Sequence, residues 1–256
     1  MEILPIELVQ YLMKYLYFED KIKLKSLSRS YYYGLRIYDL LNIRQNLTYK
    51  LNENILRNFP FIKYLRCESN YYISNLNNFS CLQILIAPHN KKINDEGIKY
   101  LNLIELNIYY SPNITNVNHM TNLRKLNAGG KCGISDYGIK DLNLYELEVF
   151  GNSKITNLNH MTNLKKLNIG GLNSKIYNEG IKNLNLIKLD INSNYNITNI
   201  NHMTKIKKLY AWNSQLEYED IKNLNLIELR IDWDSKITNY KNIKLTRKGN
   251  RVIIRN

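Results

Sequence analysis

A six-residue pattern of apolar and polar positions recurs along most of this chain. It reads apolar-x-x-Leu-x-apolar, and successive copies begin 20 to 22 residues apart. The nine copies begin at Ile62, Leu82, Leu103, Leu123, Leu144, Leu164, Leu186, Ile206 and Leu226. Alternation of this kind over a few residues indicates a short strand with one buried face. The sequence therefore predicts nine similar strands, each followed by a return segment.

A longer period is superposed on the short one. The tripeptide Ile-Thr-Asn begins at residues 114, 155, 197 and 237, at spacings of 41, 42 and 40 residues. Return segments are thus of two alternating kinds, represented by residues 136–143 and 155–162. The first kind is expected to carry a short helical turn, whereas the second is expected to be extended or irregular. Internal periods of this length are typical of repeat proteins.

The spacing, with the pattern L-x-x-L-x-L-x-x-N, resembles the leucine-rich repeats. The resemblance implies an α/β repeat solenoid with a parallel concave sheet over residues 62–240. A single unit has too little apolar surface to offset its ordering entropy, but stacked units bury a continuous core. The Asn position of the pattern is filled by Asn70, Asn90, Asn152 and Asn194. The other repeats have Ser111, Lys131, Leu172, Ser214 and Asp234 there, so we expect an incomplete asparagine ladder.

One register should apply to every copy. In residues 144–149, Leu144, Leu147 and Val149 should face inward, while the alternate positions line the concave face. The target-binding residues predicted on that face are Glu105, Tyr109, Glu146, Phe150, Lys166, Lys188, Asp190, Tyr210, Trp212, Arg230 and Asp232. Trp, Tyr and Arg are often energetic centres of interfaces, which makes 210–212 the strongest candidate. The alternative is that Trp212 packs on Phe150 or Tyr210 and only stabilises the face.

The repeat pattern is absent before residue 60. Apolar residues at 8, 12, 13, 16, 22, 24 and 27 recur with a roughly helical period, which predicts two or three short helices. Ten positions resemble the F-box motif: Leu4, Pro5, Glu7, Leu8, Leu12, Leu16, Asp20, Leu24, Ser28 and Arg29. The resemblance covers about residues 2–40. Where that family often has Trp near the end of the motif, this chain has Tyr31-Tyr32-Tyr33.

The F-box resemblance implies a partner. In that family the helices dock on the adaptor Skp1 of a cullin-RING (SCF-type) ubiquitin ligase, and the following module holds the protein to be ubiquitinated. The residues implied to bind Skp1 are Leu4, Pro5, Ile6, Leu8, Leu12, Leu16 and Leu24. The alternative is a helical cap that shields the first repeat, with no coupling to ubiquitin.

An amino-terminal F-box followed by leucine-rich repeats is similar to the short F-box/leucine-rich-repeat proteins of AT-rich genomes, including large DNA viruses. The resemblance implies a substrate-recognition subunit without chemistry of its own, bound to a Skp1-like adaptor and cullin complex. It also implies a cytoplasmic or nuclear location, in the host cell if the protein is viral. The alternative function is a leucine-rich-repeat interaction scaffold without ubiquitin coupling.

Two further segments flank the repeats. Residues 41–61 are expected to form a connecting helix or a degenerate first repeat. Residues 241–256 are expected to form a basic cap, with a turn at Lys248-Gly249-Asn250 between two strands.

Composition excludes several classes of function. The formal net charge is +14, but basic and acidic residues largely alternate along the predicted concave face, so nucleic acid is not an expected partner. No apolar run is long enough to span a membrane, and a secretory signal is not expected. Three cysteines without a C-x-x-C pair fit a reducing compartment.

No catalytic, cofactor or metal site is predicted. His119, His160 and His202 recur in Asn-His-Met-Thr, but equivalent positions two repeats apart lie about 10 Å apart, too far to share one zinc ion. We expect them to pack on the convex side. The pairs Gly129-Gly130 and Gly170-Gly171 follow strands and are expected to form turns.

Overall fold

The computed structural model describes residues 4–41, 43, 45–232, 235–237, 245–248 and 251–255. The chain divides into two compact units. Unit 1 comprises Met1–Ile114 and His119–Leu123, and unit 2 comprises Thr115–Asn118 and Arg124–Asn256.

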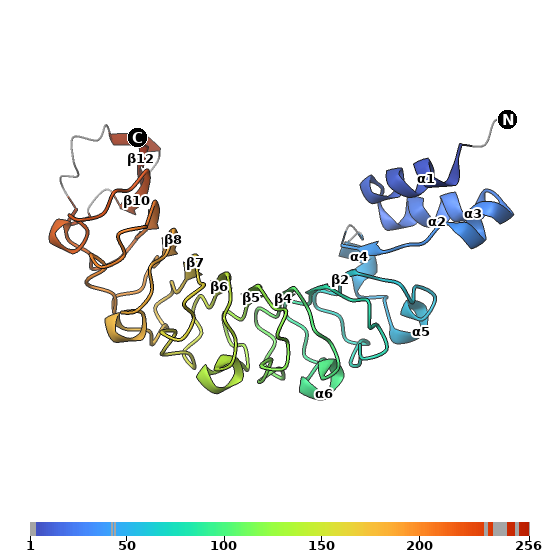
Figure 1. Ribbon diagram of the computed structural model, residues 1–256, viewed down its shortest axis with the longest axis horizontal. Helices are drawn as coiled ribbons and strands as arrows, with labels where there is room; N and C mark the ends of the chain where they lie inside the picture. The colour runs from blue at the N-terminus through green and yellow to red at the C-terminus, as the bar shows by residue number, and fades with distance from the viewer. Residues whose placement is uncertain are drawn as a thin grey trace. The chain divides into compact units, whose positions relative to one another are not determined.

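Unit 1 begins with a small cluster of helices (Figure 1): α1 (Ile6–Leu12), the 3-10 helix η1 (Met13–Tyr15), α2 (Phe18–Ser26) and α3 (Arg29–Gly34). Pro5 immediately precedes α1, a position where its missing N–H costs nothing. Ser28 caps α3 by accepting a hydrogen bond from the backbone N–H of Tyr31 at 3.1 Å. The buried Tyr31 donates its hydroxyl to the carbonyl of Leu4 at 2.9 Å, which ties the start of the chain to α3.

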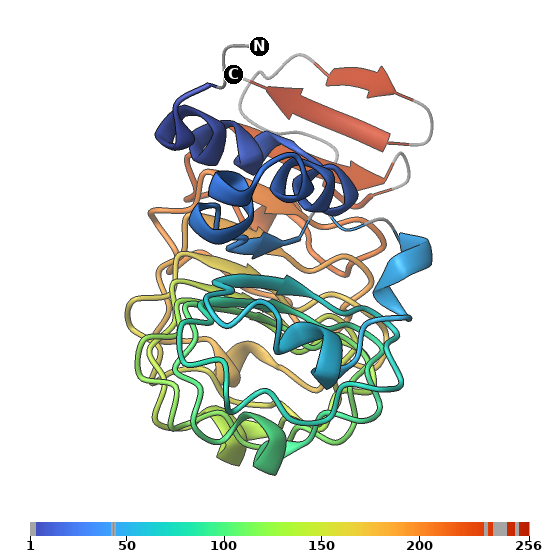
Figure 2. The ribbon, with the colours of Figure 1, turned by 90° about the vertical axis from the view of Figure 1, so that its right-hand side faces the viewer.

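The sheet of unit 1 is parallel and runs in the order β1 (Asp39–Leu40), β2 (Tyr64–Arg66), β3 (Ile84–Ile86) and β4 (Glu105–Asn107). Its return segments carry α4 (Gln45–Thr48), α5 (Glu53–Leu56) and α6 (Asp95–Ile98). In the view of Figure 2, α6 lies on the side of its turn opposite the strands. The sequence pattern did not predict β1, in which Leu40 pairs with Leu65 as a repeat leucine would.

The sheet of unit 2 continues the same design with six parallel strands: β5 (Lys125–Asn127), β6 (Glu146–Glu148), β7 (Lys166–Asn168), β8 (Lys188–Asp190), β9 (Lys208–Tyr210) and β10 (Glu228–Asp232). Beyond β10 the direction changes: β12 (Arg251–Arg255) pairs antiparallel with β10, and β11 (Leu245–Lys248) pairs antiparallel with β12. Of the turn expected at 248–250, Gly249 and Asn250 lie outside the described residues.

The predicted strand register is confirmed. Each of β2 to β10 begins two residues after the start of one copy of the pattern. Leu144, Leu147 and Val149 are buried, and Leu147 of β6 pairs with Leu167 of β7. The inward positions of successive strands therefore stack into the core, and the alternate positions lie on the opposite side, called here the open face of the sheet.

The two kinds of return segment also alternate as expected. Short helical turns occur only in one kind, as α6, η2 (Asp136–Ile139), η3 (Asn178–Gly180) and η4 (Tyr218–Asp220), among the described repeats from β3 onward. A glycine in the first three turns lets neighbouring backbones approach closely. A Cβ added at Gly138 would lie 2.0 Å from the carbonyl oxygen of Thr115, and Gly97 and Gly180 are similar. These glycines are required by packing between turns.

The asparagine ladder is extended by serine. Asn152 donates from Nδ2 to the carbonyls of Ala128 and Ile134, as the motif implies. Ser111 is buried, and its Oγ donates to the carbonyl of Ala87 at 3.0 Å. The position assigned to Leu172 from the sequence is wrong, because Leu172 is exposed and the buried ladder residue of that turn is Ser174. This turn contains two extra residues, which move the ladder position from Leu172 to Ser174. A motif with fixed spacing does not allow for such an insertion. Asp234 lies outside the described residues.

Candidate interaction surfaces

An apolar stripe lies exposed on the amino-terminal helices. Leu4, Leu8 and Leu12 are 52%, 44% and 41% exposed. A spacing of four residues places Leu8 and Leu12 of α1 on one helix face. Leu4, just before the helix, precedes Leu8 by the same interval. We call these three residues the leucine stripe.

The other residues implied to bind Skp1 are less uniform. Pro5 is exposed, whereas Ile6, Leu16 and Leu24 are half-buried. The Ile6 side chain packs against α3, since a Cβ at Gly34 would lie 2.1 Å from its Cδ1. Ile6 therefore contributes to the packing of the helices on one another. Beside the leucine stripe, the ammonium group of Lys14 lies 3.5 Å from the ring centroid of the exposed Tyr11.

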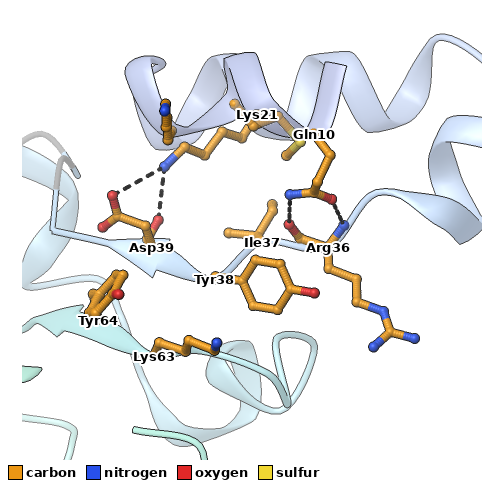
Figure 3. Close-up of a pocket in the computed structure, with 10 residues that line it drawn as sticks. Gln10, Lys21, Arg36, Ile37, Tyr38, Asp39, Lys63 and Tyr64 are labelled. Carbon is orange, nitrogen blue, oxygen red and sulfur yellow. Dashed lines mark hydrogen bonds and ion pairs between the residues drawn. The ribbon is translucent and has the colours of Figure 1, made fainter. Parts of the chain in front are cut away.

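Polar contacts join the helices to β1 and to the segment just before it (Figure 3). Lys21 of α2 is buried and donates from Nζ to the carbonyl of Asp39 at 3.0 Å, with the Asp39 carboxylate 3.8 Å away. Burial lowers the pKa of Lys21, and the charge of Asp39 partly opposes this shift. The amide of Gln10 bonds both backbone groups of Arg36, at 2.8 and 2.7 Å. Between these contacts and β2 lies a cavity of 240 Å³.

Unit 1 presents aromatic rings at the ends of its strands. Tyr109 is half-buried, and its ring centroid lies 4.7 Å from that of Tyr110. Tyr110 stacks on His89, with ring centroids 5.3 Å apart and planes 16° from parallel. Both Tyr110 and His89 have positive φ, which the turn after each strand imposes. Glu105, the other predicted residue in unit 1, is half-buried on β4.

Much of the charge on the open face of unit 2 is paired across neighbouring strands, as alternation of sign predicted. Lys166 of β7 lies 3.1 Å from the Glu146 carboxylate of β6. Glu228 of β10 bonds both Lys208, at 3.2 Å, and Arg230, at 2.6 Å. Burial raises the pKa of Glu228, but the hydrogen bonds and charges of Arg230 and Lys208 outweigh it and lower the pKa below its ordinary value.

Tyr210 is held between two cations. Arg230 lies 4.2 Å and Lys188 4.9 Å from its ring centroid, and its hydroxyl is 3.4 Å from the Glu228 carboxylate. Asp190 on the adjacent strand accepts a hydrogen bond from the backbone N–H of Asn192, and burial raises the pKa of its carboxyl group. Tyr210 is thus part of a network that stabilises the face.

Trp212 and Phe150 are the two other large aromatic residues predicted on this face, and the backbone N–H of Trp212 donates to Asn192 Oδ1 at 2.8 Å. Both are exposed, and among the described residues Trp212 stacks on no other aromatic ring. The Phe150 ring lies over the next turn, because a Cβ at Gly170 would be 3.1 Å from its Cδ2. The suggested packing of Trp212 on Phe150 or Tyr210 is therefore not found. Asp232, the last residue of β10, accepts a hydrogen bond from the backbone N–H of Asn213.

Comparison with known proteins bears on the fold. No family model and no curated protein matches the chain. Among solved structures, the TLR13–ssRNA13 complex is similar with a TM-score of 0.51 at 18% identity, over 82% of this chain and 35% of that chain. The leucine-rich repeat domain of APL1B has a TM-score of 0.47 at 14% identity, over 93% of this chain and 85% of that chain. An internalin from Listeria monocytogenes has a TM-score of 0.45 at 19% identity, over 73% of this chain and 66% of that chain.

The chain has a leucine-rich-repeat fold. The likeness to the TLR13 structure agrees with the strand register and buried ladder found above. The chain spans 66% of the internalin and 35% of the chain in the TLR13 structure, and identities below 20% establish the fold alone.

Within this fold, the repeated histidines contact backbone carbonyls. The Nε2 atoms of His119, His160 and His202 lie 3.2, 3.1 and 3.3 Å from the carbonyls of Ile98, Ile139 and Ile181. No cluster of three metal-binding side chains occurs among the described residues. Cys67 is buried, which raises the pKa of its thiol to about 12. In the described part of the chain, no helix has the length and apolar content needed to cross a membrane.

Sequence reasoning missed three lysines. Lys131, Lys154 and Lys175 line a hollow of 730 Å³ where the turns follow β5, β6 and β7. In the repeat pattern Lys131 stands only as a departure from the asparagine ladder. The signal that could have found the hollow is the run of glycines at 130, 151 and 171 beside lysines that have no acidic neighbour in sequence.

Proposed function

We propose that this chain is the substrate-recognition subunit of a cullin-RING ubiquitin ligase. In this proposal α1, α2 and α3 dock on a Skp1-like adaptor, and the repeats hold a target protein. The chain would act by positioning the target, with no bond made or broken by its own residues.

The leucine stripe is the observation that carries this proposal. Three leucines exposed by 41% or more on a small helical cluster are a costly feature unless a partner covers them. The stripe also coincides with positions where the sequence resembles the F-box. The packing of Ile6 on Gly34 and the bond from Tyr31 to Leu4 hold the helices together and leave the stripe outward.

The second part of the proposal concerns the target. Trp212 and Phe150 are exposed aromatic side chains beside a face whose charges are mostly paired. Buried aromatic anchors commonly dominate the energetics of interfaces, whereas rim charges contribute little. We propose that Trp212 is the principal anchor for the target, with Phe150 as a second contact.

The test is capture of purified Skp1 by the full chain. The variant Leu4→Asp/Leu8→Asp/Leu12→Asp is expected to lose capture, because three carboxylates replace the apolar contact. The matched control is Ile104→Asp/Ile187→Asp/Ile227→Asp, whose isoleucines are 42%, 42% and 45% exposed and lie in the repeats. Circular dichroism establishes that both variants are folded. Equal capture by both variants, or no capture by the folded wild-type chain, would rule out the ligase assignment.

An interaction scaffold without ubiquitin coupling is the alternative. The contacts of Lys21 with Asp39 and of Gln10 with Arg36 favour it, because they make the helices a cover for the edge strand β1. A helical cap of this kind would not explain why the leucine stripe is exposed. Retained target binding together with absent Skp1 binding would support this alternative.

A further inference from the structure

The hollow at the turns after β5, β6 and β7 lies beside the strand ends of unit 2. Its 730 Å³ are bounded by residues 130–132, 151–154 and 172–175, with Tyr177 and Asn196. These segments come from three successive turns and one residue of a fourth.

Glycine leaves the hollow open. Gly130, Gly151 and Gly171 have φ of 64°, 66° and 96°. The same conformation is held in other turns by residues with side chains: Ser69, His89, Tyr110, Ser193 and Asn213. At Gly151 the turn therefore does not demand glycine, since a Cβ would meet no atom within 4 Å, whereas a Cβ at Gly171 would lie 2.9 Å from the backbone nitrogen of Gly151. Three consecutive turns thus lack the side chains that occupy this position elsewhere.

The charge around the hollow is entirely positive. Lys131, Lys154 and Lys175 are exposed, and no Asp or Glu is among the lining residues. None of the three is in an ion pair within the described part of the chain. Strands of neighbouring repeats lie about 4.8 Å apart, so the lysines of successive turns are close in space. Their ammonium groups repel one another unless an anion lies between them. This arrangement differs from the open face, where Lys166 and Lys208 each have a carboxylate partner.

An apolar rim adjoins the lysines. Leu172 is 69% exposed and Tyr177 is 56% exposed. Leu172 is directed outward because the ladder position of its turn is taken by Ser174, two residues later. The amides of Asn173 and Asn196 also line the hollow, and the Asn196 Nδ2 donates to the carbonyl of Ser174 at 2.7 Å.

We propose that this hollow binds an acidic segment of a partner protein, with its carboxylates on the three lysines and an apolar side chain against Leu172 and Tyr177. Charge complementarity with the three unpaired lysines supports an anionic partner. Leu172 and the asparagine amides favour a peptide over a nucleic acid, which binds through several stacking aromatics, whereas Tyr177 is the single aromatic in the lining. The identification of this partner as a ligase target rests on the function proposed above, but peptide binding does not.

The experiment measures fluorescence anisotropy of a labelled decapeptide containing four glutamates followed by a leucine. The full chain is expected to bind it, and a peptide with glutamine for each glutamate should bind at least tenfold more weakly. Lys131→Gln/Lys154→Gln/Lys175→Gln should also weaken binding about tenfold or more, since it removes three charge pairs. The matched control removes three exposed lysines of unit 1, Lys50, Lys91 and Lys92, and should change the affinity less than about threefold.

Leu172→Ser tests the apolar rim separately. It should weaken the leucine peptide severalfold and leave a serine-containing peptide unchanged. If both triple-lysine variants lose the same affinity for the acidic peptide, binding depends on net charge alone and the proposal is overturned. Tighter binding of a single-stranded RNA dodecamer with the same dependence on Lys131, Lys154 and Lys175 would overturn it in favour of nucleic acid. The variant Lys131→Gln/Lys154→Gln/Lys175→Gln is also tested for Skp1 capture. Because the three lysines lie outside the helices proposed to bind Skp1, capture should be retained, so failure of peptide binding and failure of the ligase assignment can be told apart.

Discussion

The imidazole Nε2 of His160 lies 3.1 Å from the carbonyl oxygen of Ile139, on the short helix of the preceding turn. The pairs His119 with Ile98 and His202 with Ile181 repeat this contact within their own units. Carbonyls at the end of a helix lack partners within the helix. Each of these carbonyls accepts from the backbone N–H three residues later, as Ile139 does from Leu142, and the repeated histidine supplies a second donor that links one turn to the next.

Replacing His160 with alanine should lower the free energy of unfolding by about 1 kcal/mol, because the Ile139 carbonyl loses one of its two hydrogen bonds and keeps that from the backbone N–H of Leu142. Urea denaturation followed by circular dichroism measures the change. Gln215→Ala, at an exposed position, is the control and should change the free energy by less than about 0.5 kcal/mol. Equal stability of the two variants would contradict a bonding role for the histidine.

Gly138→Ala should destabilise the fold by about 1–3 kcal/mol, because the new Cβ would meet the Thr115 carbonyl at 2.0 Å. Gly151→Asn is the comparison. Asn tolerates positive φ and occupies the same turn position at Asn213, so the cost should be below about 1 kcal/mol. Thermal melts of both variants check the order, and a larger loss for Gly151→Asn would contradict it.

Glu228→Gln should lower the melting temperature at neutral pH, since it removes the ion pairs with Lys208 and Arg230. The folded-state pKa of Glu228 is lowered, so its stabilisation is present above the unfolded-state pKa and is lost as the pH falls through the folded one. The difference between wild type and variant should therefore vanish under acidic conditions below the ordinary value of 4.5. A difference that is independent of pH would show that the charge is not responsible.

Tyr210→Ala and Trp212→Ala should have opposite consequences. Tyr210 lies between Arg230 and Lys188, so its removal should cost about 1 kcal/mol or more of unfolding free energy. Trp212 is exposed, and its removal should leave stability nearly unchanged while weakening target binding by about 2 kcal/mol. Chemical denaturation and target titration separate the two effects. Loss of stability in Trp212→Ala would assign it a packing role instead.

The alternating pattern predicted the nine strands β2 to β10 and their inward residues, because a strand's two faces are set by local geometry and the apolar period matches it. It did not reveal β1, whose Asp39–Leu40 lies in the segment that resembles an F-box. Nor did it place the ladder at Ser174, since two extra residues are invisible to a motif of fixed spacing.

Many contacts of single side chains depended on the tertiary structure. Tyr210 contacts Arg230 of the next strand, a residue distant in sequence, and not the nearby ring of Trp212, and this choice depends on which atoms of neighbouring strands meet. The hollow beside Lys154 likewise arises from glycines and lysines of separate turns brought together by stacking. Sequence alone determined the repeat, its register and its inward positions, because these follow from local periodicity. Side-chain partners and open spaces were decided by the stacking of turns, which local periodicity does not encode.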